Sequence, residues 1–278
     1  MRLIQNGRLV PDLLALCRKY GINAPDDITA DELNSRLQET WFKAGYLRYQ
    51  IKGEPPSSED RELLRSLGCL NAVPLPVLMF DFTGVLLLGA LRSRIVSRLH
   101  YLTTVAPRPK FKSVESVLKI YLLGGARPLD PEKESSAVLC TPAELPFIPG
   151  WLAPPELPKT EAEMMAFTWK QSQLPLEWRA ELGNAPLQPK PEGGTRLPNT
   201  ADTVRVWLSD HEPQPGTYLA ISNQPFVQYQ ELVLQRLVPS GFTIYACGPA
   251  ASPTLPLATY LDNLAKQLYE ELAASPAA

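Results

Sequence analysis

Two acidic side chains are the groups in this sequence best suited to acid–base chemistry. Glu161 lies in the run TEAEMM, and Asp202 lies in the run NTAD. Both runs have the form of a helix start, where a carboxylate near the ends of the predicted strands could exchange protons with a bound small molecule. The two histidines, His100 and His211, are far apart in sequence, and no Ser/His/Asp or Cys/His arrangement is apparent. Nucleophilic hydrolysis is therefore not predicted.

Small and polar residues follow the predicted strands, and they would let a ligand approach the backbone. Arg127 would add a bidentate cationic contact. We expect helix N-termini at Thr200 and Asn223 to present free amides to an anion or a carboxylate, and Ser222 or Asn223 to orient a substrate. The predicted ligand-binding residues are Gly89, Gly124, Gly125, Arg127, Asn199, Thr200, Ser222, Asn223 and Gln224.

Each of these residues also has a purely structural explanation. Asn199, Thr200 and Asp202 are ordinary N-cap and first-turn residues, and Ser222 or Asn223 could simply cap a helix. Neither glycine turn matches a dinucleotide-binding or P-loop motif, so the sequence does not identify a cofactor.

The cysteine spacing and the charge argue against a metal site and against a nucleic-acid partner. Cys17, Cys69, Cys140 and Cys247 have neither zinc-finger nor C-x-x-C spacing, so no metal site is predicted and reduced thiols in a cytoplasmic protein are expected. The formal net charge is −2 and the pI is about 5.8, without a basic block. A nucleic-acid partner is therefore not expected.

The sequence also argues against a membrane protein. The N-terminus has no sustained apolar run and no small-residue cleavage site, so no signal peptide is predicted. The most hydrophobic stretch, 73–91, is interrupted by Pro74, Pro76, Asp81 and Gly84, and it is too short to span a bilayer.

Apolar runs that alternate with helical patterns indicate the architecture that would position these residues. Alternation of this kind is typical of a three-layer, Rossmann-like α/β fold with a parallel sheet. Residues 172–198, rich in Pro and Gly, are expected to be irregular. Pro225 is expected at the first position of the helix after the third strand. The predicted strands are 82–88, 117–123, 218–222 and 242–247, and helices are predicted at 92–102, 160–171, from 199, from 223 and at 256–273.

The first 75 residues differ in character from the rest. Apolar residues have helical spacing at 11–20, in the segment that follows the capping box 29–32, and at 58–67. No group of residues suited to catalysis appears in this region. We therefore divide the chain into a helical N-terminal extension, 1–75, and a Rossmann-like domain, 76–278. The extension is either a structural cap or a partner-binding module. The Pro-rich segment 140–159 either packs over the sheet edge or forms a wall of the pocket.

The order of these motifs resembles the YdcF/SanA-like domains, a family of largely undefined function. In this family the first strand ends in a Gly turn, which VLLLGA resembles, and the next helix has an Arg-Leu pair, which Arg98-Leu99 resembles. The family's second strand ends in Gly-Gly, and IYLLGG is similar to it. TEAEMM, NTAD and YLAISNQP follow in the family's order, so the resemblance covers about residues 80–250. It implies a Rossmann-like fold with a pocket lined by Gly89, Gly124, Gly125, Glu161, Asn199, Thr200, Asp202 and Ser222.

The sequence departs from this family at three points. A His and an Arg usually follow the third strand, where this chain has Gln224-Pro225 and then Gln228-Tyr229-Gln230. The acid of the Asn-Thr motif is Asp202 here and usually Glu in the family. Many members of the family are attached to the cell envelope by a membrane anchor, and we do not expect this attachment here.

Two functions remain open from the sequence. The first is binding of a small molecule, nucleotide-like or adenosyl-type, with Glu161 and Asp202 as acid–base groups if the protein is an enzyme. The second is a non-catalytic scaffold that binds a protein through residues 1–75 and the Pro-rich segment.

Overall fold

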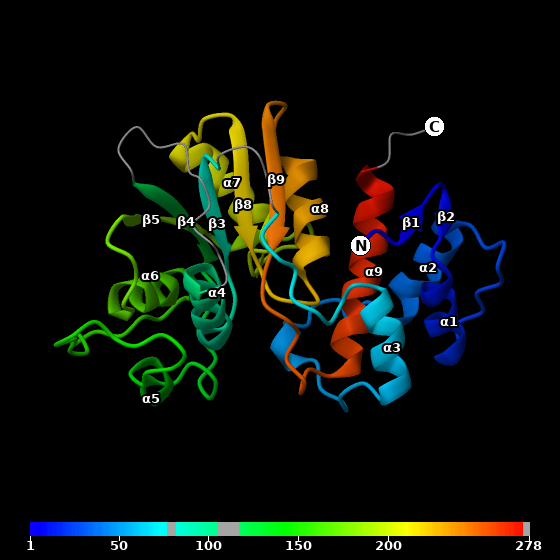
Figure 1. Ribbon diagram of the computed structural model, residues 1–278, viewed down its shortest axis with the longest axis horizontal. Coiled ribbons are helices and arrows are strands. Elements are labelled where there is room, and N and C mark those ends of the chain that lie inside the picture. The colour runs from blue at the N-terminus through cyan, green and yellow to red at the C-terminus, as the bar shows by residue number, and fades with distance from the viewer. Residues whose placement is uncertain (77–81, 105–116, 275–278) are drawn as a thin grey trace. The chain divides into compact units, whose positions relative to one another are not determined.

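The computed structural model describes residues 1–76, 82–104 and 117–274 (Figure 1). Contacts divide the chain into two compact units. Unit 1 comprises 1–73, 223–236 and 250–278, and unit 2 comprises 74–222 and 237–249. The predicted extension thus shares a unit with segments from the other end of the chain. Residues 77–81 of the most hydrophobic stretch lie outside the described residues.

Unit 2 is built on a five-stranded parallel sheet in the order β5-β4-β3-β8-β9. The central strand β3 is buried along its whole length, which explains its uninterrupted apolar sequence. The strands are β3 (Gly84–Leu88), β4 (Leu118–Gly125), β5 (Trp178–Ala185), β8 (Gly216–Ile221) and β9 (Phe242–Cys247). The predicted parallel α/β fold is confirmed.

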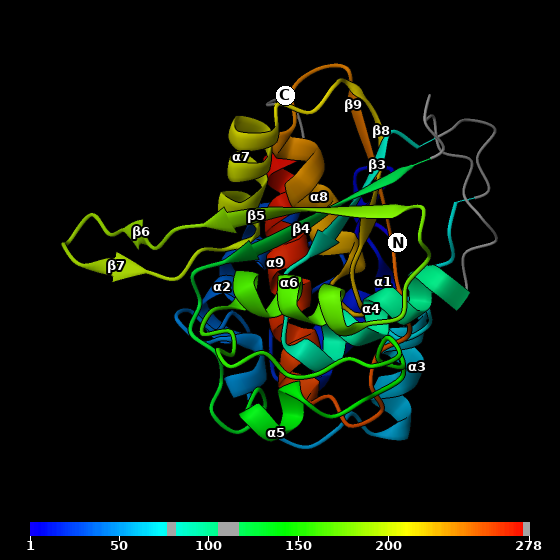
Figure 2. The same ribbon diagram turned by 90° about the vertical axis from the view of Figure 1, so that its left-hand side faces the viewer.

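Helices cover both faces of this sheet (Figure 2). On one face, Gly124 of β4 lies against Ala162 of α6. On the opposite face, Tyr121 of β4 meets Trp207 of α7, with ring centroids 5.7 Å apart. The helices of unit 2 are α4 (Arg92–Thr104), α5 (Ser136–Leu139), α6 (Glu161–Gln171) and α7 (Thr200–His211), and a hairpin of β6 (Gln188–Pro189) and β7 (Thr195–Arg196) extends beyond β5.

Unit 1 is mainly helical and contains the C-terminal helix α9 in its core. Leu264 and Leu268 of α9 are fully buried in one apolar cluster with residues from α1, α2 and α3. Glu271 accepts hydrogen bonds from the amides of Leu3 and Ile4, each at 2.9 Å, and so ties the N-terminus to α9. The elements are β1 (Ile4–Gln5), β2 (Arg8–Leu9), α1 (Pro11–Lys19), α2 (Ala30–Thr40), η1 (Arg48–Gln50), α3 (Ser58–Ser66), α8 (Val227–Leu237) and α9 (Leu257–Ala274).

The structure corrects two sequence predictions. Residues 172–198 are not irregular throughout, because they contain β5. This strand lies at the edge of the sheet and is half exposed, so its sequence, WRAELGNA, lacks an apolar run. Helix α8 begins at Val227, so Pro225 is not at its first position and no helix N-terminus lies at Asn223.

No helix in the described part of the chain combines the length and the apolar character needed to cross a membrane.

Candidate functional site

The strand order identifies one place at the sheet edge where a ligand could bind. The chain runs from β3 outward to β4 and β5, and then returns to the other side of β3 to form β8 and β9. Loops that leave neighbouring strands at such a reversal diverge, and ligands of open α/β sheets bind at the carboxyl ends of the strands there. Gly89 follows β3 and Ser222 follows β8, so both residues lie at this reversal.

Glu161 lies beside Gly89 at this edge. As the first residue of α6, Glu161 places its Oε2 so close to Gly89 that a Cβ on Gly89 would be 2.7 Å from it. A side chain at residue 89 would therefore displace the Glu161 carboxylate from its place at the end of β3. The Glu161 side chain is 14 % exposed. Burial raises the pKa of this carboxyl above its usual value, against the opposing effect of the Arg127 guanidinium.

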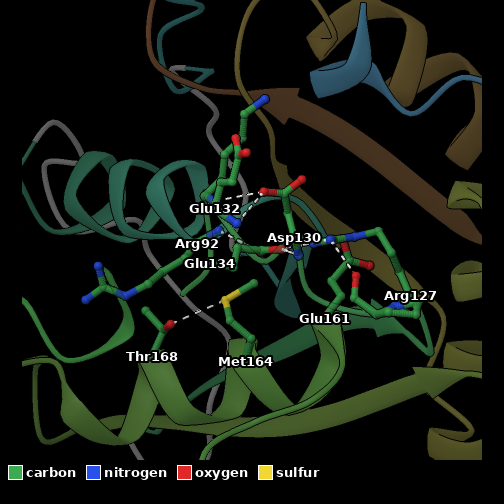
Figure 3. A network of polar contacts seen from close by, with 10 residues as sticks. Arg92, Arg127, Asp130, Glu132, Glu134, Glu161, Met164 and Thr168 are labelled. Atoms are coloured by element: carbon green, nitrogen blue, oxygen red, sulfur yellow. Dashed lines mark hydrogen bonds and ion pairs between the residues drawn. The ribbon is translucent and has the colours of Figure 1, made fainter. Parts of the chain in front are cut away.

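Arg127 and Glu134 form a buried ion pair next to Glu161 (Figure 3). Arg127 donates from Nη1 and Nη2 to the two carboxylate oxygens of Glu134, at 2.8 and 3.0 Å, and from Nε to Glu161 Oε1 at 3.3 Å. Arg127, predicted as a ligand contact, thus holds one oxygen of Glu161. Among the described residues, Glu161 Oε2 has no hydrogen-bond partner.

The carboxylate of Glu134 accepts hydrogen bonds from four donors. Glu134 is not among the site residues that the sequence predicts. Besides Arg127, the amides of Asp130 and Arg92 donate to it, at 2.8 and 3.2 Å. Its side chain is 0 % exposed. The local sequence, DPEKE, is that of an exposed turn, so no local signal distinguishes Glu134 from its acidic neighbour Glu132.

Two arginines of α4, Arg92 and Arg98, are buried. Arg98 is fully buried and donates to the carbonyl oxygens of Leu88 and Gly89, where β3 ends. Arg92 donates from Nη2 to the Thr141 carbonyl at 2.9 Å. An arginine on α4 thus binds the carbonyls that end β3. The Arg98-Leu99 pair of the family resemblance was the one signal for this role.

The two adjacent glycines at the end of β4 are required by packing. A Cβ on Gly124 would be 2.7 Å from Cα of Ala162, and one on Gly125 would be 2.4 Å from Cγ of Pro198. Both contacts are far shorter than a real Cβ makes, so α6 and Pro198 occupy the space beside these glycines. Their role as ligand contacts stays a prediction.

Asn199, Thr200 and Asp202 begin α7. The Asn199 side chain accepts from the Asp202 amide, and the Asp202 carboxylate accepts from the Asn199 amide at 2.9 Å, which forms a capping box. Arg196 donates to both Asp202 oxygens, at 2.6 and 3.1 Å. Burial alone would raise the pKa of Asp202, but the hydrogen bonds from Arg196 and Asn199 outweigh it, so the pKa lies below its usual value. Asp202 is thus an ionised structural carboxylate.

Replacing the cap tests this assignment. We expect Asn199→Ala to lower the free energy of unfolding by about 1 kcal/mol, because an amide at the start of α7 loses its side-chain acceptor. Urea unfolding gives the value. Ser209→Ala, near the other end of α7, should change it by less than about 0.5 kcal/mol. An unchanged midpoint for Asn199→Ala would contradict the capping role.

The residues after β8 fall in different units. Ser222 is fully buried in unit 2, and its amide donates to the Cys247 carbonyl at 2.9 Å. Asn223 and Gln224 belong to unit 1. Gln224 is buried and donates from Nε2 to the Gly68 carbonyl at 2.6 Å. The structure therefore groups Gly89, Arg127 and Glu161 at one point, while Asp202 is engaged in its own ion pairs.

The Pro-rich segment packs on the end of α6. The rings of Phe147 and Trp151 are tilted against each other with centroids 4.5 Å apart, and Trp151 in turn meets Phe167 of α6 at 5.8 Å between ring centroids. Ile148 also lines a hollow of about 280 Å³ between the end of α6 and the start of β5. The segment thus packs on α6, and its role as a wall of the ligand pocket stays a prediction.

No protein-family model, no curated protein and no solved structure matches this chain. The five-stranded parallel sheet in the order β5-β4-β3-β8-β9, with helices on both faces, makes it a Rossmann-like α/β protein. The described residues contain no group of three or more His, Cys, Asp or Glu side chains that could hold a metal ion.

Proposed function

We propose that unit 2 binds a small molecule of nucleotide-like or adenosyl type at the end of β3, and that Glu161 is its main polar contact. One observation carries the proposal. The Glu161 side chain is 14 % exposed, and its Oε2 has no hydrogen-bond partner in the described part of the chain, while Arg127 binds the other oxygen. A carboxylate held in this way is ready to accept hydrogen bonds from a ligand.

The Glu161 carboxylate accepts hydrogen bonds, which favours a ligand with hydroxyl donors. In Rossmann-type sites an acidic side chain accepts hydrogen bonds from ribose hydroxyls. Gly89 contributes by leaving the space that the Glu161 carboxylate occupies where β3 ends. The resemblance to YdcF/SanA-like domains supports the same pocket through Gly89 and Glu161.

Glu161 is also the group of this site that is suited to proton transfer. Its raised pKa brings it closer to neutral pH than an ordinary carboxyl group, which favours both accepting and returning a proton. Asp202 does not share this role, because two arginines contact it and its pKa is lowered. If the protein is an enzyme, Glu161 is its acid–base residue.

A thermal-shift series with the full chain tests this function. The probes are adenosine, AMP, ATP and S-adenosyl compounds. A probe at about a hundred times its dissociation constant adds roughly 2.7 kcal/mol of stability. We expect Glu161→Gln to reduce this gain to about 1 kcal/mol or less, because a hydrogen bond to a charged group contributes roughly 1.5–3 kcal/mol.

The matched control is Glu163→Gln, the same chemical change two residues along α6. Glu163 is exposed and caps the helix, a role that Gln also fills. Wild type and Glu163→Gln should show equal stabilisation. Equal stabilisation in Glu161→Gln would contradict the site, and no stabilisation of wild type by any probe would contradict the ligand class.

A further inference from the structure

The outer edge of β5 presents unpaired backbone groups. β5 ends the sheet, and among the described residues no strand pairs with its outer side. The amide of Leu118 donates to the Glu177 carbonyl and that of Ala126 to the Ala185 carbonyl, so odd-numbered residues of this segment turn their backbone groups toward β4. Since backbone groups alternate along a strand, the even-numbered residues turn theirs outward. The amide of Trp178 already donates to the Pro175 carbonyl at 3.1 Å, and its carbonyl accepts from Arg179 Nη1 at 3.0 Å, so the unpaired groups are those of Ala180 and Leu182.

Most of the exposed apolar side chains of unit 2 lie on β5 or beside it. Among the described residues, five large hydrophobic side chains of this unit are exposed. Leu182 belongs to β5, Leu176 and Leu187 flank it, and the Pro-rich segment that packs on the end of α6 supplies the other two. Clustered exposure of this kind marks an interaction surface, whereas scattered residues would not. The five are Ile148, Leu152, Leu176, Leu182 and Leu187.

The sequence of β5 is complementary to itself. If two copies pair antiparallel about Ala180, Arg179 faces the partner's Glu181, and Trp178 faces the partner's Leu182. The two Ala180 residues then exchange the central pair of backbone hydrogen bonds of the ladder. Centring the pairing one residue later would place Glu181 opposite the partner's Glu181, and like charges directly opposite each other destabilise a sheet.

We propose that β5 docks antiparallel against β5 of a second copy of this chain, centred on Ala180, to form a symmetric dimer. The dimer joins the two five-stranded sheets into one, which removes both unpaired edges. Backbone hydrogen bonds and apolar contacts hold the copies together, and the charge pairs select the register.

The existing contacts of Glu181 leave room for the pairing, whereas Arg179 must exchange its own. Within one copy Arg179 donates from Nη1 to the carbonyls of Leu176 and Trp178, at 2.5 and 3.0 Å, and it gives up these contacts when it binds the partner's Glu181. Glu181 binds Lys119 of β4 at 3.2 Å and His211 of α7 at 3.3 Å. A carboxylate accepts several hydrogen bonds, so the partner's Arg179 can add another from the outer side. On the other face, Trp178 stacks on Trp169, with ring centroids 6.5 Å apart, which gives the partner's Leu182 an apolar surface to contact.

Disulfide trapping tests the register. In full-length Ala180→Cys, the two introduced thiols of a dimer lie directly opposite each other, within the reach of a disulfide. We expect a covalent dimer on a non-reducing gel after mild oxidation. Asn184→Cys, an exposed position on the same edge, should stay monomeric, because residue 184 faces residue 176 of the partner in this register. A covalent dimer of Asn184→Cys but not of Ala180→Cys would overturn the register.

Sedimentation of the full chain tests the dimer itself. Wild type should shift from monomer to dimer as its concentration rises through the micromolar range. Arg179→Glu should raise the dissociation constant at least tenfold, and Arg179→Glu combined with Glu181→Arg should restore dimerisation. Arg65→Glu, the same charge change on α3, should leave it unchanged. A wild type that stays monomeric, or an Arg179→Glu variant that dimerises as well as wild type, would overturn the proposal.

Discussion

A truncated chain that lacks residues 1–73 is expected to aggregate on expression. These residues form one core with α9, in which Tyr260, Leu261, Leu264 and Leu268 are buried. Their removal would expose this face of α9. At about 1.5–3 kcal/mol for each large apolar side chain, the loss is about 6–12 kcal/mol, which is comparable to the whole stability of a typical domain.

Polar contacts add to this dependence. Gln38 donates to the Ala265 carbonyl at 3.0 Å, and Gln267 donates to the Met1 carbonyl at 2.9 Å. Soluble yield, far-UV circular dichroism and ANS binding measure the outcome for residues 74–278. As a control, residues 1–73 supplied as a separate polypeptide should raise the soluble yield.

The opposite outcome has a definite meaning. If residues 74–278 remain soluble and unfold cooperatively, the region is not a structural cap. The alternative function, a scaffold that binds a protein partner through residues 1–75, would then be favoured. A pull-down with residues 1–75 would be the next experiment.

Replacing Glu134 by Gln is expected to cost about 3–5 kcal/mol of the free energy of unfolding. The four contacts of the Glu134 carboxylate are all donors, two from Arg127 and one each from the amides of Asp130 and Arg92. A Gln side chain has nearly the same shape, but its amide group would point N–H groups at these donors. It would also leave the buried Arg127 guanidinium without its closest counter-charge.

Urea unfolding of Glu134→Gln and of the control Glu132→Gln measures this difference. Glu132 lies in the same turn but is exposed, so its replacement should change the free energy of unfolding by less than about 0.5 kcal/mol. Equal midpoints for the two variants would show that the buried ion pair does not stabilise the fold.

The features that depend on neighbours in the sequence could be predicted from the sequence alone. The capping motifs Thr160–Glu163 and Asn199–Asp202 begin helices because N-cap side chains satisfy amides only three residues away. The apolar run of β3 indicates a strand buried on both faces, and its alternation with helical patterns predicts the parallel α/β fold. The place of Glu161 at a helix start could be predicted in the same way, while its role as an acid stays a prediction.

The tertiary structure decided the features that depend on distant residues. Whether an arginine is exposed or buried depends on what lies opposite it, so the pairing of Arg127 with Glu134 and the burial of Arg98 could not be predicted locally. The edge strand β5 is stabilised by pairing with β4, since its own sequence lacks an apolar run. The association of α9 with residues 1–73 is likewise a contact between opposite ends of the chain, and it has no signal within either segment.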